Sequence, residues 1–311
     1  MTTIALRTGV GGFGHPTINA AGTVAFFATE SVFIDDQIVT GNGGSLTTIA
    51  DTVGQFSGFS GGGYSTAINS AGTVAFWALP DTRPAGIFAS SGGTVTPLFL
   101  NSVSLSANNE IAFNDAGTVA FRKTNGTGIV TVSGGSITTI VDSAGPLKSF
   151  GYAPSMNAAG TVAFVAGVAG IDGGTFGIYI GNGGSLTTIA DISGPFSSFD
   201  SFNFGQPSIN DAGAVAFLSS LDVGGFGIYT GDGTETSEVI GSGDQLFGST
   251  VASLQISPTS LNDTGQLSFY YRLANGTTGI ALATPVPEPG SAAVLFGGLL
   301  AVLGSRRRRA Q

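Results

Sequence analysis

Few side chains in this sequence have the chemistry of a catalytic centre. The 311 residues contain one histidine, His15, and no cysteine, which excludes disulfides, thiolate metal sites, cysteine nucleophiles and centres with several histidines. A Ser-His-Asp triad would have to use His15, the one histidine of the chain. We therefore expect His15 to be a solvated or structural loop residue, and we assign no catalytic residue.

The acidic residues are the other candidates, because glycosidases take a general acid and a base or nucleophile from two carboxylates. Many of them recur at equivalent positions of an internal repeat, which predicts a task performed in every repeat, such as capping a turn. These recurring residues are Asp51, Asp142, Asp191, Asp115, Asp211 and Asp263. A unique catalytic acid would instead lie in a variable loop, where the candidates are Asp81, Asp172, Asp200 and Asp222.

Motifs for metals and cofactors are weak. The sequence has no EF-hand loop and no GGxGxD array, although Asp35-Asp36, or Asp232 with Glu235, could bind one calcium ion weakly. Residues 9–14 read G-x-G-x-x-G, but His15 and Pro16 follow where a dinucleotide site needs a helix. We expect neither a metal nor a cofactor.

The charge is low in amount and acidic in sign. Charged residues make up 9% of the chain, against roughly 25% in an average globular protein. The formal charge is −9, and four of the ten basic residues are Arg306 to Arg309. An acidic body repels phosphates, which argues against nucleic acid as a partner.

An internal repeat organises most of the chain. NAAGTVAF occurs at residues 19–26 and 157–164, and GNGGSLTTIAD occurs at 41–51 and 181–191. Weaker copies fill the intervals and place the repeated asparagine 43 to 53 residues apart, at Asn19, Asn69, Asn114, Asn157, Asn210 and Asn262. The sequence therefore contains six units of one supersecondary structure.

Each unit is expected to form four short antiparallel strands. The first ends at the asparagine, and N-x-x-G suits a type I turn. The second, TVAF, alternates large and small residues at the period of a strand. The third begins with Gly-Ile, and a glycine-rich hairpin leads to the fourth, LTTIAD. This is the unit of a β-propeller blade.

The two ends of the repeat region predict how the propeller closes. The sixth unit (259–284) has only three strands, and Thr2-Thr3-Ile4-Ala5 matches the fourth-strand residues 187–190. We predict an all-β, six-bladed propeller over 1–284, closed by the N-terminal strand. A further unit upstream would make seven blades, and a parallel β-helix or a pair of β-sandwiches are the alternative folds.

The last residues form a separate region, 285–311. Val286-Pro287-Glu288-Pro289 precedes an uncharged apolar stretch, residues 291–304, which Arg306, Arg307, Arg308 and Arg309 follow. This order resembles the PEP-CTERM sorting signal of Gram-negative bacteria that produce exopolysaccharide. The resemblance implies a C-terminal hydrophobic helix as a transient membrane anchor, the exosortase as processing partner, and an exported protein of the cell surface or extracellular matrix. Residues 1–7 contain no signal peptide, so export would need a leader.

Together these features predict an exported binding or structural module rather than an enzyme. The variable loops between second and third strands, at 29–36, 79–85, 122–127, 165–176 and 218–226, would present the contact surface. Their Phe and Tyr residues would stack on sugars of the exopolysaccharide. The alternatives are a polysaccharide hydrolase or lyase on the same scaffold, and a matrix protein without a specific ligand.

Overall fold

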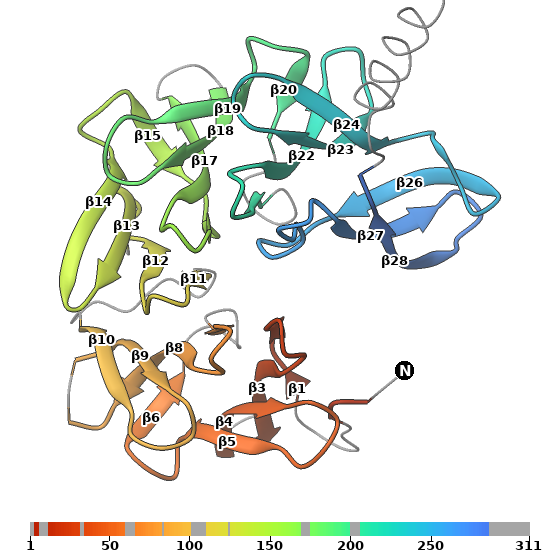
Figure 1. Cartoon of the computed structure of the whole chain (residues 1–311). Coiled ribbons are helices and arrows are strands. Elements are labelled where there is room, and N and C mark those ends of the chain that lie inside the picture. Colours follow the sequence, from red (N-terminus) through yellow and green to blue (C-terminus); the bar gives the residue numbers. More distant parts are fainter. Residues whose placement is uncertain are drawn as a thin grey trace, which may run out of the picture.

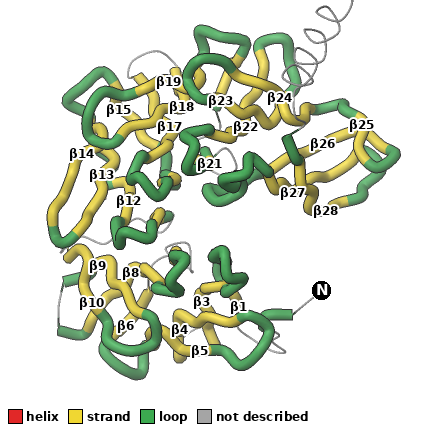
Figure 2. Tube along the Cα trace, in the orientation of Figure 1, coloured by secondary structure: helices red, strands yellow, loops and turns green. Residues whose placement is uncertain are grey.

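The structure is a computed structural model, which describes residues 3–5, 12–31, 34–59, 66–82, 84–100, 110–123, 125–168, 175–199 and 206–285. Figure 2 shows that the described residues form strands and loops, without a helix, so the all-β prediction is confirmed. Accordingly, none of these residues belongs to a helix that could cross a membrane. The predicted C-terminal helix, with Val286–Pro289 and Arg306–Arg309, lies outside the described residues.

The strands form six antiparallel sheets, which we number in chain order. Sheet 1 contains β1 (Gly12–Phe13), β2 (Thr17–Ile18), β3 (Val24–Ser31), β4 (Ile34–Gly41) and β5 (Thr47–Asp51). Sheet 2 contains β6 (Phe56–Phe59), β7 (Thr66–Ile68), β8 (Val74–Pro80), β9 (Gly86–Ser90) and β10 (Thr96–Leu100). Sheet 3 contains β11 (Ile111–Phe113), β12 (Val119–Arg122), β13 (Gly128–Ser133) and β14 (Ser136–Asp142).

The second half of the chain repeats this plan. Sheet 4 contains β15 (Leu147–Phe150), β16 (Ser155–Met156), β17 (Val162–Val168), β18 (Thr175–Gly181) and β19 (Thr187–Asp191). Sheet 5 contains β20 (Phe196–Ser198), β21 (Ser208–Ile209), β22 (Val215–Leu221), β23 (Phe226–Gly231) and β24 (Thr236–Gly241). Sheet 6 contains β25 (Gln245–Leu246), β26 (Ser249–Gln255), β27 (Leu267–Leu273) and β28 (Thr278–Ala283). Figure 1 shows the six sheets in chain order around a common centre, the arrangement of a propeller.

The innermost strand of a sheet is broken into two pieces, where the sequence predicted one. In sheet 4, β15 pairs with the end of β17 and β16 with its beginning. The same division separates β1 from β2, β6 from β7, and β20 from β21. In sheets 1 and 4, where the whole break is described, residues 14–16 and 151–154 separate the two pieces.

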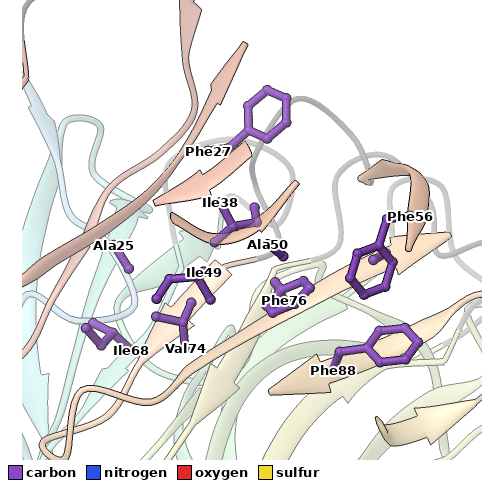
Figure 3. Close-up of a cluster of buried hydrophobic side chains, with 11 residues drawn as sticks. Ala25, Phe27, Ile38, Ile49, Ala50, Phe56, Ile68, Val74, Phe76 and Phe88 are labelled. Carbon is purple, nitrogen blue, oxygen red and sulfur yellow. The ribbon is translucent and has the colours of Figure 1, made fainter. Parts of the chain in front are cut away.

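Apolar side chains fill the spaces between successive sheets. Figure 3 shows the first interface, where Ala25 and Ile38 of sheet 1 meet Phe56 and Phe76 of sheet 2. The Phe56 and Phe76 rings meet edge to face, with centroids 5.8 Å apart, a favourable aromatic geometry. Four further clusters join sheets 2 and 3, 3 and 4, 4 and 5, and 5 and 6 in the same way. The alternation of VAF predicted this packing, with the small alanine on one face.

The repeated asparagine closes the predicted turn and also joins neighbouring sheets. In all six repeats its carbonyl accepts the amide of the glycine three residues on, and that glycine has positive φ, as the N-x-x-G pattern requires. The Asn157 Oδ1 accepts the Thr161 amide at 3.0 Å, while its Nδ2 donates to the Asn210 carbonyl of the next sheet at 3.2 Å. Equivalent bonds run from Asn19 to Asn69 and from Asn210 to Asn262.

The predicted closure by the N-terminal strand is wrong in this structure. Sheet 6 lacks a strand equivalent to β5 or β19, as expected, but among the described residues β28 pairs only with β27. Residues 3–5 form no strand. Ile4 and Ala5 instead pack on Phe26 of sheet 1. Among the described residues no strand pairing and no core cluster joins sheets 6 and 1, and Figure 1 shows the ring open between them.

Candidate functional site

The innermost strands of the six sheets surround a cavity of about 600 Å³ at the centre of the ring. Every sheet contributes to its wall, through residues such as Ile18, Ile68, Phe113, Met156, Ile209 and Tyr270. A concave site of this size, mainly apolar and with few polar groups, is the usual form of a ligand site. The cavity is therefore the candidate site.

Serine hydroxyls fix the innermost strands relative to one another. Ser155 Oγ donates to the Pro258 carbonyl at 2.7 Å and accepts the Ile209 amide at 3.1 Å. Ser208 Oγ accepts the amide of Leu261 at 2.9 Å. Because these bonds join residues 53 to 103 positions apart in sequence, they hold the wall of the cavity in one arrangement.

Three polar side chains from different sheets meet in the cavity wall. Glu110 stands directly before β11, Gln206 shortly before β21, and His15 in the loop between β1 and β2. Gln206 Nε2 donates to Glu110 Oε1 at 3.3 Å. His15 Nδ1 lies 3.9 Å from the same oxygen. The Glu110 amide donates to the Tyr152 carbonyl at 3.2 Å, which holds this carboxylate in place from its backbone.

Desolvation shifts the pKa of both titratable groups in the cavity wall. It raises the pKa of Glu110, and the hydrogen bond from Gln206 opposes this shift only partly. Burial also lowers the pKa of His15. Both shifts favour uncharged groups, so the pair is suited to exchange hydrogen bonds with an uncharged polar ligand. A carboxylate with a raised pKa in a cavity is also a general indicator of a functional site.

These three residues occupy one position of the repeat. His15, Glu110 and Gln206 each lie four residues before the repeated asparagine of their unit, namely Asn19, Asn114 and Asn210. The other three units carry Ser65, Ala153 and Pro258 there. The turn and strand residues therefore recur from unit to unit, while the residue four positions before the asparagine varies. Such variation on a constant scaffold can produce a specific site.

The comparisons with known proteins agree with the fold. A "Family of unknown function (DUF7453)" matches residues 114–257, and no curated protein matches the sequence. The structure of YCF48 bound to a D1 peptide is 13% identical, covers 93% of this chain and 82% of its own, and has a TM-score of 0.51. At this identity the likeness shows the fold alone.

Two further solved structures are more distant. A fungal lectin from Aleuria aurantia, described as a six-bladed β-propeller with a novel mode of fucose recognition, is 11% identical and has a TM-score of 0.44, with coverage of 91% of this chain and 98% of the lectin. A prolyl endopeptidase is 12% identical, with a TM-score of 0.42 and coverage of 90% of this chain. The chain spans 50% of the peptidase.

The recurring aspartates have structural tasks, as predicted. Asp51, Asp142 and Asp191 accept amides two or three residues further along and cap the turn after the fourth strand. The second set joins sheets instead of capping its own turn: the carboxylates of Asp115, Asp211 and Asp263 accept the amides of Ser70, Ala158 and Asp211 in the preceding sheet. The sequence predicted the recurrence but not this partner.

The remaining candidates do not gather into a site. Asp81 and Asp222 are exposed, and Asp172 and Asp200 lie outside the described residues. Asp232 caps its own turn, accepting the amide and hydroxyl of Thr234 at 2.9 and 2.6 Å, which lowers its pKa. Asp36 bonds to Thr52 through its backbone. Within the described parts of the chain, His, Asp and Glu side chains form no cluster of three that could hold a metal.

The predicted contact surface on the variable loops is not supported. Of the aromatic residues in those loops, Phe176 and Phe226 pack against the cores between sheets, and Phe33 lies outside the described residues. The rings of Phe176 and Phe226 are therefore partly buried between the sheets. The polar and aromatic groups that could contact a ligand line the central cavity instead.

Proposed function

We propose that the protein is an exported binding module of the cell surface or the exopolysaccharide matrix. Its ligand is an uncharged, hydroxylated molecule, namely a short segment of a neutral polysaccharide, which enters the central cavity. The meeting of Glu110, Gln206 and His15 in the cavity supports this proposal best.

The chemistry of the cavity fits a sugar better than an ion. Carboxyl, carboxamide and imidazole groups can each donate or accept hydrogen bonds to hydroxyl groups. Phe113 of sheet 3 and Tyr270 of sheet 6 add aromatic surface to the lining of the same cavity. The apolar face of a sugar packs on such rings. Because the formal charge of the chain is −9, an anionic polymer would be repelled as it approached.

A hydrolase on this scaffold is a weaker interpretation. Glycoside hydrolysis generally needs two carboxyl groups roughly 5 to 9.5 Å apart. Glu110 is the one carboxylate among the described residues that line the cavity. A second acid would have to come from elsewhere in the chain. Binding needs only the groups already present.

A binding experiment separates these functions. The purified protein is incubated with neutral exopolysaccharide, and both its retention and the appearance of new reducing ends are measured. Retention without new ends supports a binding module, new ends indicate a hydrolase, and neither result indicates a matrix protein without a specific ligand. New unsaturated ends would indicate a lyase.

Substitutions in the cavity locate the binding site. Glu110→Ala or Gln206→Ala should each weaken retention by about tenfold, the equivalent of one hydrogen bond of roughly 1.4 kcal/mol. Asp222→Ala is the matched control, because Asp222 is an exposed acid outside the cavity. If Asp222→Ala weakens retention as much as Glu110→Ala, the binding site is not the cavity.

The sorting tail supports export and surface location. We infer that the exosortase cleaves near Val286–Pro289 after residues 291–304 have halted translocation and Arg306–Arg309 have remained on the cytoplasmic side. Mass spectrometry of the native protein from the producing cells should find the C-terminus without its arginines. A surface-located protein that retained Arg306–Arg309 would contradict this processing.

A further inference from the structure

On the sheet 6 side of the opening between sheets 6 and 1, an isoleucine that is buried in the other sheets is exposed to solvent. The third strand of each repeat unit contains an isoleucine. In sheets 1 to 5 this isoleucine packs against the following sheet. Its exposed fraction is 0 to 1% in Ile38, Ile87, Ile129, Ile178 and Ile228, but 79% in Ile280. Leu282, two residues along β28, is 60% exposed. This face of sheet 6 therefore has the apolar composition of an interface between sheets, and the described residues leave it largely exposed.

On the opposite side of the opening, sheet 1 also exposes a residue whose equivalents are buried in other repeats. The residue directly before the repeated asparagine faces the preceding sheet, and it is buried in Ile68, Ile209 and Leu261 with 6 to 9% exposure. Its equivalent in sheet 1, Ile18, is 60% exposed. Since Ile18 and Ile280 are both exposed while lining the same cavity, the two walls do not cover each other.

The segment 3–5 already occupies the place of an outer strand from a preceding sheet. In sheets 4 and 5, a β-carbon added to Gly181 or Gly231 would lie 3.3 Å from the Cγ2 of Ile140 or Ile189, the fourth-strand isoleucine of the sheet before. In sheet 1, a β-carbon on Gly41 would lie 3.4 Å from Ile4 Cγ2. Ile4 therefore sits where the fourth-strand isoleucine of one more sheet would sit.

The hydrogen bonds between sheets stop at the same opening. Asn157 and Asn210 each donate from Nδ2 to the asparagine carbonyl of the following sheet. Asn262, the last in the series, donates instead to Gln266 Oε1 within its own turn, at 3.0 Å. The Nδ2 of Asn262 therefore bonds within its own turn, where Asn157 and Asn210 bond to a following sheet.

We propose that the opening between sheets 6 and 1 is a docking site for one further repeat unit of the same kind, whose outermost strand is formed by residues 3–5. Its first three strands would precede residues 3–5 in the chain, because a glycine-rich hairpin leads into the fourth strand in each of the five sheets that have one. The unit would cover Ile280 and Leu282 on one wall and Ile18 on the other. With this unit the propeller would have seven blades in a closed ring. No sheet would then expose a face that packs on a neighbouring sheet.

The sequence itself provides the test unit. Residues 145–186 of the fourth repeat end immediately before Thr187-Thr188-Ile189-Ala190, which Thr2-Thr3-Ile4-Ala5 matches. A fusion that joins residue 186 to Thr2 in front of the full chain therefore recreates a complete repeat. Because the chain has no cysteine, a single Ile280→Cys substitution reports how accessible this wall is to a thiol reagent.

The fusion should slow the labelling of Cys at position 280 by at least about tenfold, because the docked unit removes it from water, and should raise the Tm while the protein stays monomeric. Val223→Cys is the matched control: Val223 is 93% exposed on a loop of sheet 5, and its labelling rate should not change. The same insert with Val162→Ser and Phe164→Ser, which cannot form a core, should give no protection.

Three results would overturn the proposal. One is slow labelling at position 280 in the parent monomer, which would mean that sheet 1 closes on sheet 6 directly. Another is protection in the parent that rises with protein concentration, which would identify a second copy as the occupant. The third is a folded fusion without protection. Residues 194–236 of the fifth repeat, joined to Thr2 in the same way, provide a second insert if the first fails to fold.

Discussion

The carboxamide of Asn157 joins two repeats that lie 53 residues apart: its Nδ2 donates to the carbonyl of Asn210 at 3.2 Å. The same side chain closes its own turn through Oδ1, which accepts the Thr161 amide at 3.0 Å. One buried side chain therefore fixes both the local turn and the position of the next sheet. Asn19 and Asn210 make the same bond to the following sheet, which explains why asparagine, rather than aspartate or serine, stands at these N-x-x-G turns.

Asn157→Ala should destabilise the protein by about 2 kcal/mol, because it removes two hydrogen bonds and leaves the Thr161 amide without its acceptor, while the Asn210 carbonyl still accepts the Gly213 amide. Asn157→Asp keeps the acceptor but replaces the donor by a buried carboxylate oxygen that faces the Asn210 carbonyl, so its cost at neutral pH should be at least as large. Denaturant unfolding followed by fluorescence measures both. Asn182→Ala is the control, since Asn182 is exposed and its bond to Gly184 is long, at 3.4 Å. An equal loss of unfolding free energy in Asn157→Ala and Asn182→Ala would contradict the double role of Asn157.

Gly160 tests the backbone of the turn separately from its side chains. It has a φ of +80°, and a β-carbon there would have no neighbour within 4 Å. Gly160→Ala should therefore cost about 1 kcal/mol through backbone strain alone. Gly93→Ala is matched in space, with no neighbour within 4 Å, but without a positive φ. It should change the unfolding free energy by less than about 0.5 kcal/mol, and a similar loss in both variants would rule out the conformational cause.

The repeat predicted the parts of the fold that depend on local pattern. Asn157 and Gly160 define the turn, and the VAF strand that follows alternates large and small side chains, so turn and strand could be recognised from residue types alone. The short pieces such as β15 and β20 were missed. Strands of three or four residues that pair on one side only leave no periodic pattern in a sequence.

The candidate site could not be read from residue types. His15, Glu110 and Gln206 differ in chemistry and lie about 95 residues apart in sequence, and only the arrangement of the sheets brings them together. The available signal was positional: each stands four residues before a repeated asparagine. Closure failed for a related reason, because the match of Thr2-Thr3-Ile4-Ala5 to a fourth strand does not specify which sheet that strand completes.

Phe217 tests the packing between sheets 4 and 5. Its ring is fully buried and lies 5.6 Å from Phe196 and 5.9 Å from both Phe199 and Tyr229, between centroids. Phe217→Ala should cost about 3 to 5 kcal/mol through the cavity that it leaves, and Phe217→Leu should cost less because it keeps most of the volume. Equilibrium unfolding in urea measures both. The exposed Val223→Ala serves as control, and a loss below about 1 kcal/mol for Phe217→Ala would show that the sheets do not pack as described.

Glu110 should make stability depend on pH in a defined direction. Burial raises its pKa in the folded protein above the ordinary value of 4.5, so the folded state binds this proton more tightly than the unfolded state does. The unfolding free energy must then fall as the pH rises from 4.5 through the raised pKa. Glu110→Gln removes this charge, so the variant should be more stable than the parent at pH 7, by a margin that shrinks toward pH 4.5.

The neighbouring imidazole acts in the opposite direction. Burial lowers the pKa of His15 below 6.5, so its contribution to stability is lost as the pH falls through that range. Because His15 is present in both proteins, the difference in Tm between Glu110→Gln and the parent, measured from pH 4 to 8, isolates the Glu110 contribution. Asp222→Asn removes an exposed acid and should show no such trend. A Glu110→Gln variant whose advantage grew as the pH fell would mean that the carboxylate is stabilised in its charged form, and the cavity would then be suited to a cation rather than to a neutral sugar.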